Sequence, residues 1–279
     1  MKTGLLYTLL SASLVLLTAC DSQQKLAPIV APVVADEVGE IKPGSGILRG
    51  YLDLKDLPNS LTLLPSPPGP GSAAVAVDEA IYAQMRALAN TPRWEIAVRD
   101  ADLHFPKAAE TFVCALGLEV SADRTPHLNM LLRRTLADAG FSTYRAKDHY
   151  NRTRPFVENK SASCTPSEES RLVKDGSYPS GHAAVGWAWA LVLTEIVPDR
   201  ADALLARGHA YGQSRVVCGV HWQSDVDAAR MMGAAAVARL HADPVFRAQM
   251  KAAADEVKLV RGTGAQPSRN CAAEAEALK

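Results

Sequence analysis

The sequence has no excess of charge of either sign: 30 Lys and Arg residues stand against 30 Asp and Glu residues in a chain of 279. Proteins that attract nucleic acid through their overall field carry a surplus of basic residues, so this balance argues against a nucleic-acid partner. Any anion site must therefore be local, built from a few basic side chains that the fold brings together. With 48% hydrophobic and 22% charged residues, the composition is that of a globular protein.

Regular alternation of apolar and polar residues, the pattern of half-buried β-strands, is also missing, and no internal repeat is present. From residue 73 onward, apolar residues instead recur at 3.6-residue spacing or form Ala-rich cores. This pattern predicts a predominantly helical chain. The expected helices cover residues 73–89, 93–102, 108–116, 125–139, 182–197, 201–217, 224–242 and 244–259.

The apolar run at residues 5–17 is too short to cross a membrane comfortably, which takes about 20 residues. Because Lys2 precedes it and a small-residue cleavage site follows it, the run predicts a signal peptide over residues 1–20. The mature chain lacks the several long apolar spans of an integral membrane protein. Membrane contact is therefore expected through the N-terminus alone.

The cleavage site, Leu-Thr-Ala-Cys, resembles a bacterial lipobox, which predicts lipidation of Cys20 and a protein anchored on the periplasmic side of the envelope. The alternative is cleavage near Ala19 and a soluble periplasmic protein. Asp21 resembles an inner-membrane retention signal. Residues 21–48, rich in Pro, Val, Ala, Gly and acid, are expected to form a flexible tether.

Cysteine is scarce, and no two cysteines have the C-x2-C spacing of a zinc site, so no metal is expected. Four remain after Cys20, an even number that predicts two disulfides in an exported protein. Sequence alone leaves three pairings open among them. They are Cys114, Cys164, Cys218 and Cys271.

Prolines and glycines interrupt the chain in two further places. Residues 61–71 contain four prolines, which predict an extended stretch without helix. The folded domain is expected to span residues 49–262. The tail at residues 263–279 should fray unless Cys271 holds it.

The most informative stretch is Gly-Ser-Tyr-Pro-Ser-Gly-His-Ala at residues 176–183, followed by a long apolar run. Ser180 and Gly181 fall at the first turn of the predicted helix, where free backbone N–H groups and the positive dipole end favour an anion such as phosphate. His182 adds an ionisable group at the same place. Alone, this stretch also fits a capped core helix with a surface His.

Basic residues flank this stretch on both sides. Lys147 and Arg154 precede it, and Arg215 follows it. A phosphoryl dianion needs several fixed cations, since Arg forms forked bonds to phosphate oxygens and Lys supplies a point charge. Each residue taken alone is equally an ordinary surface charge.

His221 and Asp225 are four residues apart and share a face if the following helix extends back one turn. The carboxylate of Asp225 could then hold one ring nitrogen of His221, so that the other nitrogen presents a lone pair. The alternative is a structural His–Asp pair that caps the helix.

Together these pieces form the pattern Lys-x6-Arg-Pro, Pro-Ser-Gly-His and Ser-Arg-x5-His-x3-Asp. This pattern resembles the three-part signature of the type 2 phosphatidic acid phosphatase superfamily, shared with vanadium haloperoxidases. The longer stretches around it, from about residue 51 to about residue 250, are similar to class A bacterial non-specific acid phosphatases. One departure is Ala183, where these enzymes usually carry Thr, a change that could loosen the support of His182.

The resemblance implies an all-α, single helical-bundle domain that hydrolyses small phosphate monoesters without cofactor or metal, with phosphotransfer as a side activity. It implies that His221 is the nucleophile, oriented by Asp225, and that His182 protonates the leaving group. The phosphoryl oxygens would be bound by Lys147, Arg154, Ser180, Gly181 and Arg215. The alternatives are a vanadate-dependent haloperoxidase, a lipid phosphate phosphatase and a non-catalytic phosphate-binding lipoprotein; a homo-oligomer is compatible with each.

If the three parts converge on one phosphate, Cys164 and Cys218 come to the same side of the site. The resemblance therefore implies a Cys164–Cys218 disulfide, which leaves Cys114 to pair with Cys271. In the chain-entropy picture, the first bridge stabilises the fold by roughly 4 kcal/mol.

Overall fold

The computed structural model describes Met1 and residues 29–279; the predicted signal peptide, Cys20, Asp21 and the first part of the tether lie outside these residues. The described chain is helical, and its one β-type interaction is an isolated bridge between Glu40 and Leu48. The prediction of an all-α domain is therefore confirmed. No helix in this part of the chain is long and apolar enough to cross a membrane.

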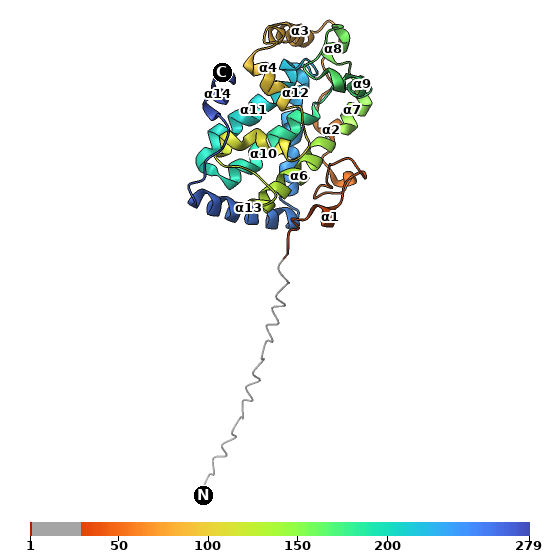
Figure 1. Cartoon of the computed structure of the whole chain (residues 1–279). Helices are drawn as coiled ribbons and strands as arrows, with labels where there is room; N and C mark the ends of the chain where they lie inside the picture. The colour runs from red at the N-terminus through yellow and green to blue at the C-terminus, as the bar shows by residue number, and fades with distance from the viewer. Residues whose placement is uncertain (2–28) are drawn as a thin grey trace.

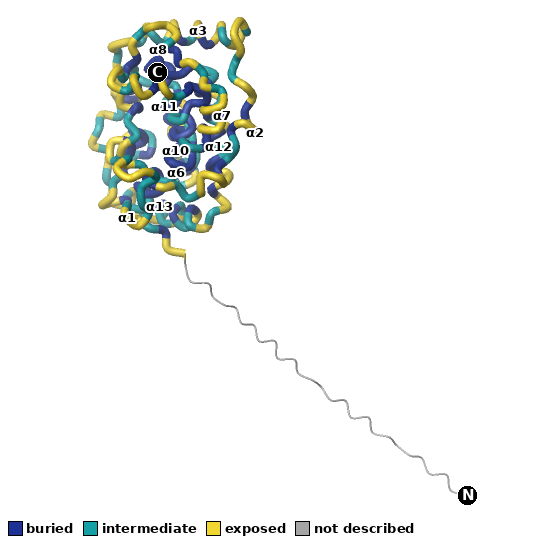
Figure 2. Tube along the Cα trace, turned by 90° about the vertical axis from the view of Figure 1, so that its right-hand side faces the viewer, coloured by how far each residue is buried: buried dark blue, intermediate teal, exposed yellow. Residues whose placement is uncertain are grey.

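Helix α10 (Gly181–Ile196) lies at the centre of the molecule, as Figure 1 shows. Helices α6 (Pro126–Phe141), α11 (Ala201–Val217) and α12 (Gln223–Leu240) pack around it, and α13 (Pro244–Gly262) packs on α6. Buried residues are concentrated along α10, α11 and α12 in Figure 2.

The position of α10 follows from its sequence. It is apolar on every side, and a helix of this kind is stable only when other elements surround it. Trp189 is fully buried, and its indole N–H donates to the Leu132 carbonyl of α6 at 2.9 Å. Small residues allow close packing: a Cβ atom added at Gly233 of α12 would lie 2.5 Å from the Ala184 carbonyl oxygen.

The amphipathic α13 covers the core from outside. Its buried residues, Phe246, Gln249, Ala253 and Val257, recur every three or four positions along one face. Asp243 caps this helix by accepting the Phe246 N–H at 2.7 Å, and Pro244 occupies the first position.

Short helices surround the bundle. Each of the eight predicted helices is present, although residues 108–116 divide into a 3-10 segment and one α-turn. The elements outside the five long helices are of two kinds: those that correspond to the ranges predicted within residues 73–116, and short helices that the apolar pattern does not reveal. They are α1 (Ala35–Val38), η1 (Leu54–Asp56), α2 (Ser60–Leu63), α3 (Ala73–Arg86), α4 (Pro92–Arg99), η2 (Lys107–Phe112), α5 (Val113–Leu116), α7 (Tyr144–Tyr150), α8 (Pro155–Glu158), η3 (Pro166–Glu168), α9 (Glu169–Leu172), η4 (Pro198–Arg200) and α14 (Cys271–Ala277).

The prediction that residues 61–71 exclude helix is wrong at their first residues. Ser60–Leu63 form one helical turn, because the prolines begin only at Pro65 and the Asn59 side chain accepts the Leu61 N–H at 3.1 Å. The turn is joined to the domain through Ser60, whose hydroxyl accepts the Ala146 N–H at 2.9 Å.

Packing also begins before the domain boundary predicted at residue 49. Ala31 and Leu48 are buried, and Arg49 donates its N–H to the Gly39 carbonyl at 2.9 Å. Just beyond, the carboxylate of Asp138 on α6 accepts the backbone N–H groups of Tyr51 and Leu52 at 2.9 and 3.1 Å. The C-terminal part of the predicted tether is therefore a packed strap.

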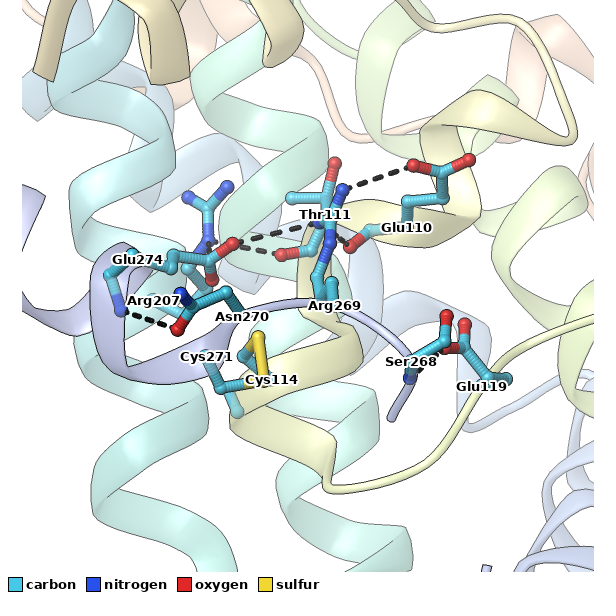
Figure 3. Close-up of a disulfide and its surroundings, with 12 residues drawn as sticks. Glu110, Thr111, Cys114, Glu119, Arg207, Ser268, Arg269, Asn270, Cys271 and Glu274 are labelled. Carbon is cyan, nitrogen blue, oxygen red and sulfur yellow. Dashed lines mark hydrogen bonds and ion pairs between the residues drawn. A yellow bond between two sulfur atoms is a disulfide. The ribbon is translucent and has the colours of Figure 1, made fainter. Parts of the chain in front are cut away.

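Two disulfides are present with the pairing that the resemblance implies, Cys164–Cys218 and Cys114–Cys271. The second bond holds the C-terminal tail, which forms α14 instead of fraying. Figure 3 shows how the tail is fixed around it: Arg269 pairs with Glu110 at 3.0 Å, and the buried Glu274 lies 3.7 Å from Arg207.

The buried Asp138 carboxyl, which binds the backbone just after the strap, should make the stability of the fold depend on pH. Burial raises the pKa of Asp138 from its ordinary value to about 7. Since the folded pKa exceeds the unfolded one, this carboxyl favours folding fully below about pH 4, and that contribution is lost as pH rises through about 7. Relative to Asp138→Asn, which cannot titrate, the unchanged protein should lose about 4 kcal/mol of unfolding free energy between pH 4 and pH 8. Urea unfolding of both proteins at pH 4 and pH 8 measures this loss. A difference in unfolding free energy between the two proteins that stays constant with pH would contradict the raised pKa of Asp138.

Candidate active site

A cavity of about 380 Å³ opens at the N-terminal end of α10. Six of the residues singled out in the sequence line it. These are Lys147, Arg154, Gly181, His182, Arg215 and His221. Ser180 and Asp225 are fully buried behind the wall, where the Ser180 N–H donates to the Asp225 carbonyl at 3.0 Å.

The floor of the cavity is the first turn of α10. Ser180 is the N-cap, and its hydroxyl accepts the Ala183 N–H at 3.3 Å. Gly181 begins the helix, so its N–H belongs to the group of unpaired donors at a helix start. The prediction that the Pro-Ser-Gly-His stretch opens this helix is confirmed.

His221 lies in the loop before α12 and is buried. Its Nε2 is 3.0 Å from Nη1 of Arg154, and its Nδ1 is 3.4 Å from Oδ2 of Asp225. A guanidinium can only donate, so Nε2 must accept and the ring hydrogen must be on Nδ1, facing the carboxylate. Burial, followed by the charge of Arg154, holds the pKa of His221 well below its ordinary value, which keeps the ring neutral. The available lone pair of the ring is therefore on Nε2, where it accepts the hydrogen bond from Arg154.

The sequence analysis places His221 and Asp225 on one helix face only if the helix extends back one turn. In the structure the helix that carries Asp225 does not reach His221. It begins at Gln223, and Asp225 accepts the Trp222 N–H at 2.8 Å. The tight turn still brings the His221 ring to the carboxylate. At 3.4 Å their contact is longer than a well-formed hydrogen bond.

Two of the three predicted cations are held by backbone oxygens. Lys147 donates to the Gly176 carbonyl at 2.7 Å, and burial lowers the pKa of its amine to about 8. Arg154 donates to the carbonyls of Leu172 and Asp175, both at 2.9 Å. These contacts position both cations along one wall of the cavity.

Arg215 differs from both. Its side chain is fully buried, and none of its three guanidinium nitrogens has a hydrogen-bond partner among the described residues. Burial lowers its pKa to about 10. A buried cation without hydrogen-bond partners in the protein is unfavourable, so this group favours an anion in the cavity that it lines.

His182 is the second residue of α10 and also lines the cavity. Its Nε2 lies 3.0 Å from the Ala101 carbonyl oxygen, which can only accept, so the hydrogen of the neutral ring is on Nε2. Burial, followed by the charge of Arg215, holds the pKa of His182 well below its ordinary value. The support of this ring comes from Ala101, and Ala183 is itself buried in an apolar cluster.

The geometry agrees with the comparisons to known proteins. Residues 128–248 match the PAP2 superfamily. The chain is 47% identical over 221 residues to a non-specific acid phosphatase of Providencia stuartii, an alignment that covers 77% of this chain and 89% of that protein. The chain belongs to the non-specific acid phosphatases of the PAP2 superfamily. It is also 42% identical to such a phosphatase of Salmonella typhimurium, over 71% of this chain and 80% of that one, and 40% identical to an acid phosphatase of Zymomonas mobilis, over 74% and 78%.

In this acid phosphatase, Ser214 of the signature lies away from the cavity. Its hydroxyl donates to the Asp100 carboxylate at 2.6 Å, and Arg207 donates to the same carboxylate at 3.1 Å through Nη1. Asp100 directly precedes Ala101, whose carbonyl holds His182. The network therefore ties the position of His182 to α11, and sequence patterns gave no sign of Asp100 or Arg207.

The remaining wall of the phosphatase cavity is largely apolar. It is formed by Ile47 of the strap together with Leu103, Leu136, Phe141 and Val185, and charged residues such as Glu168 and Arg171 complete the lining. These residues fall outside the three-part signature, so the sequence offered no reason to select them. They leave room for an uncharged group beside the anion.

Arg215 yields a test that separates binding from stability. Arg215→Met removes an unpaired buried cation, so the free energy of unfolding without ligand should rise by about 1 kcal/mol or more. Inorganic phosphate, which should raise the melting temperature of the unchanged phosphatase, should then have no effect. The matched control is Arg207→Met, which breaks a buried ion pair and should lower stability by about 3 kcal/mol. Calorimetry with and without phosphate measures both effects. If phosphate still raised the melting temperature of Arg215→Met, Arg215 would not be the group that binds the anion.

Proposed function

We propose that this acid phosphatase hydrolyses phosphate monoesters through a covalent phosphohistidine on His221. The observation that supports it most is the orientation of this ring, with an Nε2 lone pair beside Arg154 and an Nδ1 hydrogen toward Asp225. A neutral imidazole held in this way is prepared for nucleophilic attack.

In the first step, Nε2 of His221 attacks phosphorus, the P–N bond forms and the P–O bond to the alcohol breaks. His182, protonated at Nδ1, gives its proton to the leaving oxygen. In the second step, water attacks phosphorus, returns a proton to His182, and the P–N bond breaks to release phosphate. An alcohol in place of water would give phosphotransfer.

The phosphoryl oxygens would be bound by Lys147, Arg154, Arg215 and the Gly181 N–H, whereas Ser180, which the sequence also predicts as a ligand, lies behind the cavity wall and caps α10. A loose phosphoryl transition state needs mainly positioning and positive charge. These three cations supply the charge that a metal ion would otherwise bring, and we propose a metal-independent reaction on that ground.

The protonation of His182 accounts for activity in acid. In the free enzyme, burial and Arg215 keep the pKa of His182 low, so the ring is neutral near neutral pH. A bound phosphate dianion offsets the charge of Arg215 and raises that pKa. Lower pH and bound substrate thus both favour the protonated form of His182, which can donate its proton to the leaving oxygen.

We further propose that the enzyme acts on small phosphomonoesters on the periplasmic side of the envelope, anchored through a lipidated Cys20. The sequence motif at residues 17–20 supports the anchor. Mass spectrometry of the mature N-terminus would distinguish acylated Cys20 from a soluble protein cut near Ala19.

The direct test is hydrolysis of p-nitrophenyl phosphate by the purified protein in EDTA. We expect turnover unaffected by the chelator, inhibition by vanadate, which mimics the five-coordinate phosphoryl state, and loss of turnover by at least about 10³-fold in His221→Ala. Activity that disappears in EDTA and returns with zinc would refute the metal-independent reaction. Halide oxidation with bound vanadium would instead support the haloperoxidase alternative.

The role of His182 has its own test. In His182→Ala, esters of poor leaving groups should lose about 10² to 10⁴-fold in kcat/KM, while activated esters lose far less, because only poor leaving groups need the proton. The fall in kcat/KM toward high pH for poor leaving groups should also disappear. An equal loss across the series, measured with phenyl phosphates of graded leaving-group pKa, would argue against His182 as the acid.

A further inference from the structure

Asp225 has a second partner on the side away from His221. Its Oδ2 faces His221 and the Trp222 N–H, while its Oδ1 accepts a hydrogen bond from Nη1 of Arg152 at 2.7 Å. The carboxylate is fully buried. Arg152 does not line the cavity, so it acts on the site only through Asp225.

Arg152 lies between α7 and α8, and its side chain is 13% exposed. Nη1 also donates to the Ser224 hydroxyl at 2.8 Å, and Nη2 donates to Oδ2 of Asp78 at 2.8 Å. The guanidinium lies 5.5 Å from the centre of the Trp222 ring. Its fork thus spans two carboxylates from different helices, a geometry that Lys cannot reproduce.

Asp78 fixes the other end of this arrangement. It belongs to α3, outside the segment that matches the superfamily, and it is 2% exposed. Its Oδ1 accepts the Ser224 N–H at 2.8 Å, and its Oδ2 accepts the Ser224 hydroxyl as well as Arg152. Asp78 therefore holds both the guanidinium and the start of the helix that carries Asp225.

A charge at Asp225 requires such support. Burial raises the pKa of this carboxyl, and Arg152 is the main influence that lowers it. The other charged or titratable groups near it are Lys147 on α7, which also lowers the pKa, together with Arg154, Tyr178 and His221 itself. A protonated Asp225 could neither accept the Nδ1 hydrogen of His221 nor stabilise the positive ring formed on phosphorylation.

We propose that Arg152 and Asp78 are positioning residues: Arg152, held by Asp78, keeps Asp225 ionised and aimed at Nδ1 of His221. The proposal rests on His221 being the nucleophile. Asp78, Arg152 and Asp225 join α3, the α7–α8 connection and α12 behind the cavity, and they act on the substrate only through His221.

The test compares Arg152→Met, Arg152→Lys and Asp78→Asn with the unchanged enzyme. Without Arg152, Asp225 should gain its charge only at higher pH, so the acidic limb of the kcat profile should move upward by at least one pH unit. At pH 5 kcat should fall about 10- to 100-fold, the size expected for a group that orients a reacting residue, with KM nearly unchanged. Arg152→Lys should recover part of the loss, and Asp78→Asn should show a smaller shift in the same direction.

Glu79→Gln is the matched control, because Glu79 is the exposed neighbour of Asp78 on the same helix and should leave the profile unchanged. The ¹⁵N spectrum of His221 gives a readout independent of activity. We expect the Nδ1-protonated tautomer in the unchanged enzyme and a mixture in Arg152→Met. If Arg152→Met fails to fold, Arg152→Lys and Asp78→Asn carry the same comparison.

The outcomes separate this proposal from the function on which it rests. An acidic limb and a tautomer that stay unchanged in folded Arg152→Lys and Asp78→Asn, while His221→Ala remains inactive, would overturn the positioning role alone. Full turnover in His221→Ala would instead remove the proposed function. A loss of kcat without any shift of the limb would show that Arg152 serves only to pack α3 against α12, and would also overturn the proposal.

Discussion

The structure is organised around a group of three buried positive charges, of which only Arg154 has a carboxylate partner among the described residues, Asp175 at 3.2 Å. Lys147 and Arg154 are at least bound by carbonyl oxygens, whereas Arg215 has no hydrogen-bond partner among the described residues. Such a group destabilises the empty protein, and the surrounding bundle has to hold it in place. Burial and these charges together keep both histidines neutral. In the proposed mechanism the same charges bind the phosphoryl group.

The bundle holds the charges through elements that lie outside the cavity. Asp100 links His182 to α11 and, through Arg207, to the tail fixed by the Cys114–Cys271 bond (Figure 3). The Cys164–Cys218 bond joins the loop after Arg154 to the segment before His221, where the Cys164 N–H also donates to the Cys218 carbonyl at 3.0 Å. The catalytic proposal therefore depends on contacts made well beyond the reacting groups.

The long helices and most of the residues that line the cavity were predictable from the sequence. The long helices have strong 3.6-residue patterns, and the signature residues identify the cavity lining, because both depend on residue type and local spacing. The short helices α7 to α9 and α14 were not predictable, since they are held by tertiary contacts and by a disulfide. The same holds for Asp78 and Asp100: single buried carboxylates carry no local pattern, and only their distant partners reveal them. The sequence also did not reveal that His221 reaches Asp225 through a turn at Trp222 instead of through one continuous helix.

The central claim is that phosphate passes through a covalent bond to Nε2 of His221. Rapid acid-free quenching of the enzyme during turnover of a labelled monoester, followed by peptide mapping under alkaline conditions that preserve phosphohistidine, tests it most directly. The account predicts label on the peptide that contains His221, at a level that depends on Arg215 and disappears in His221→Ala. Label on another residue, or continued turnover with no labelled enzyme and inverted configuration at phosphorus, would contradict it.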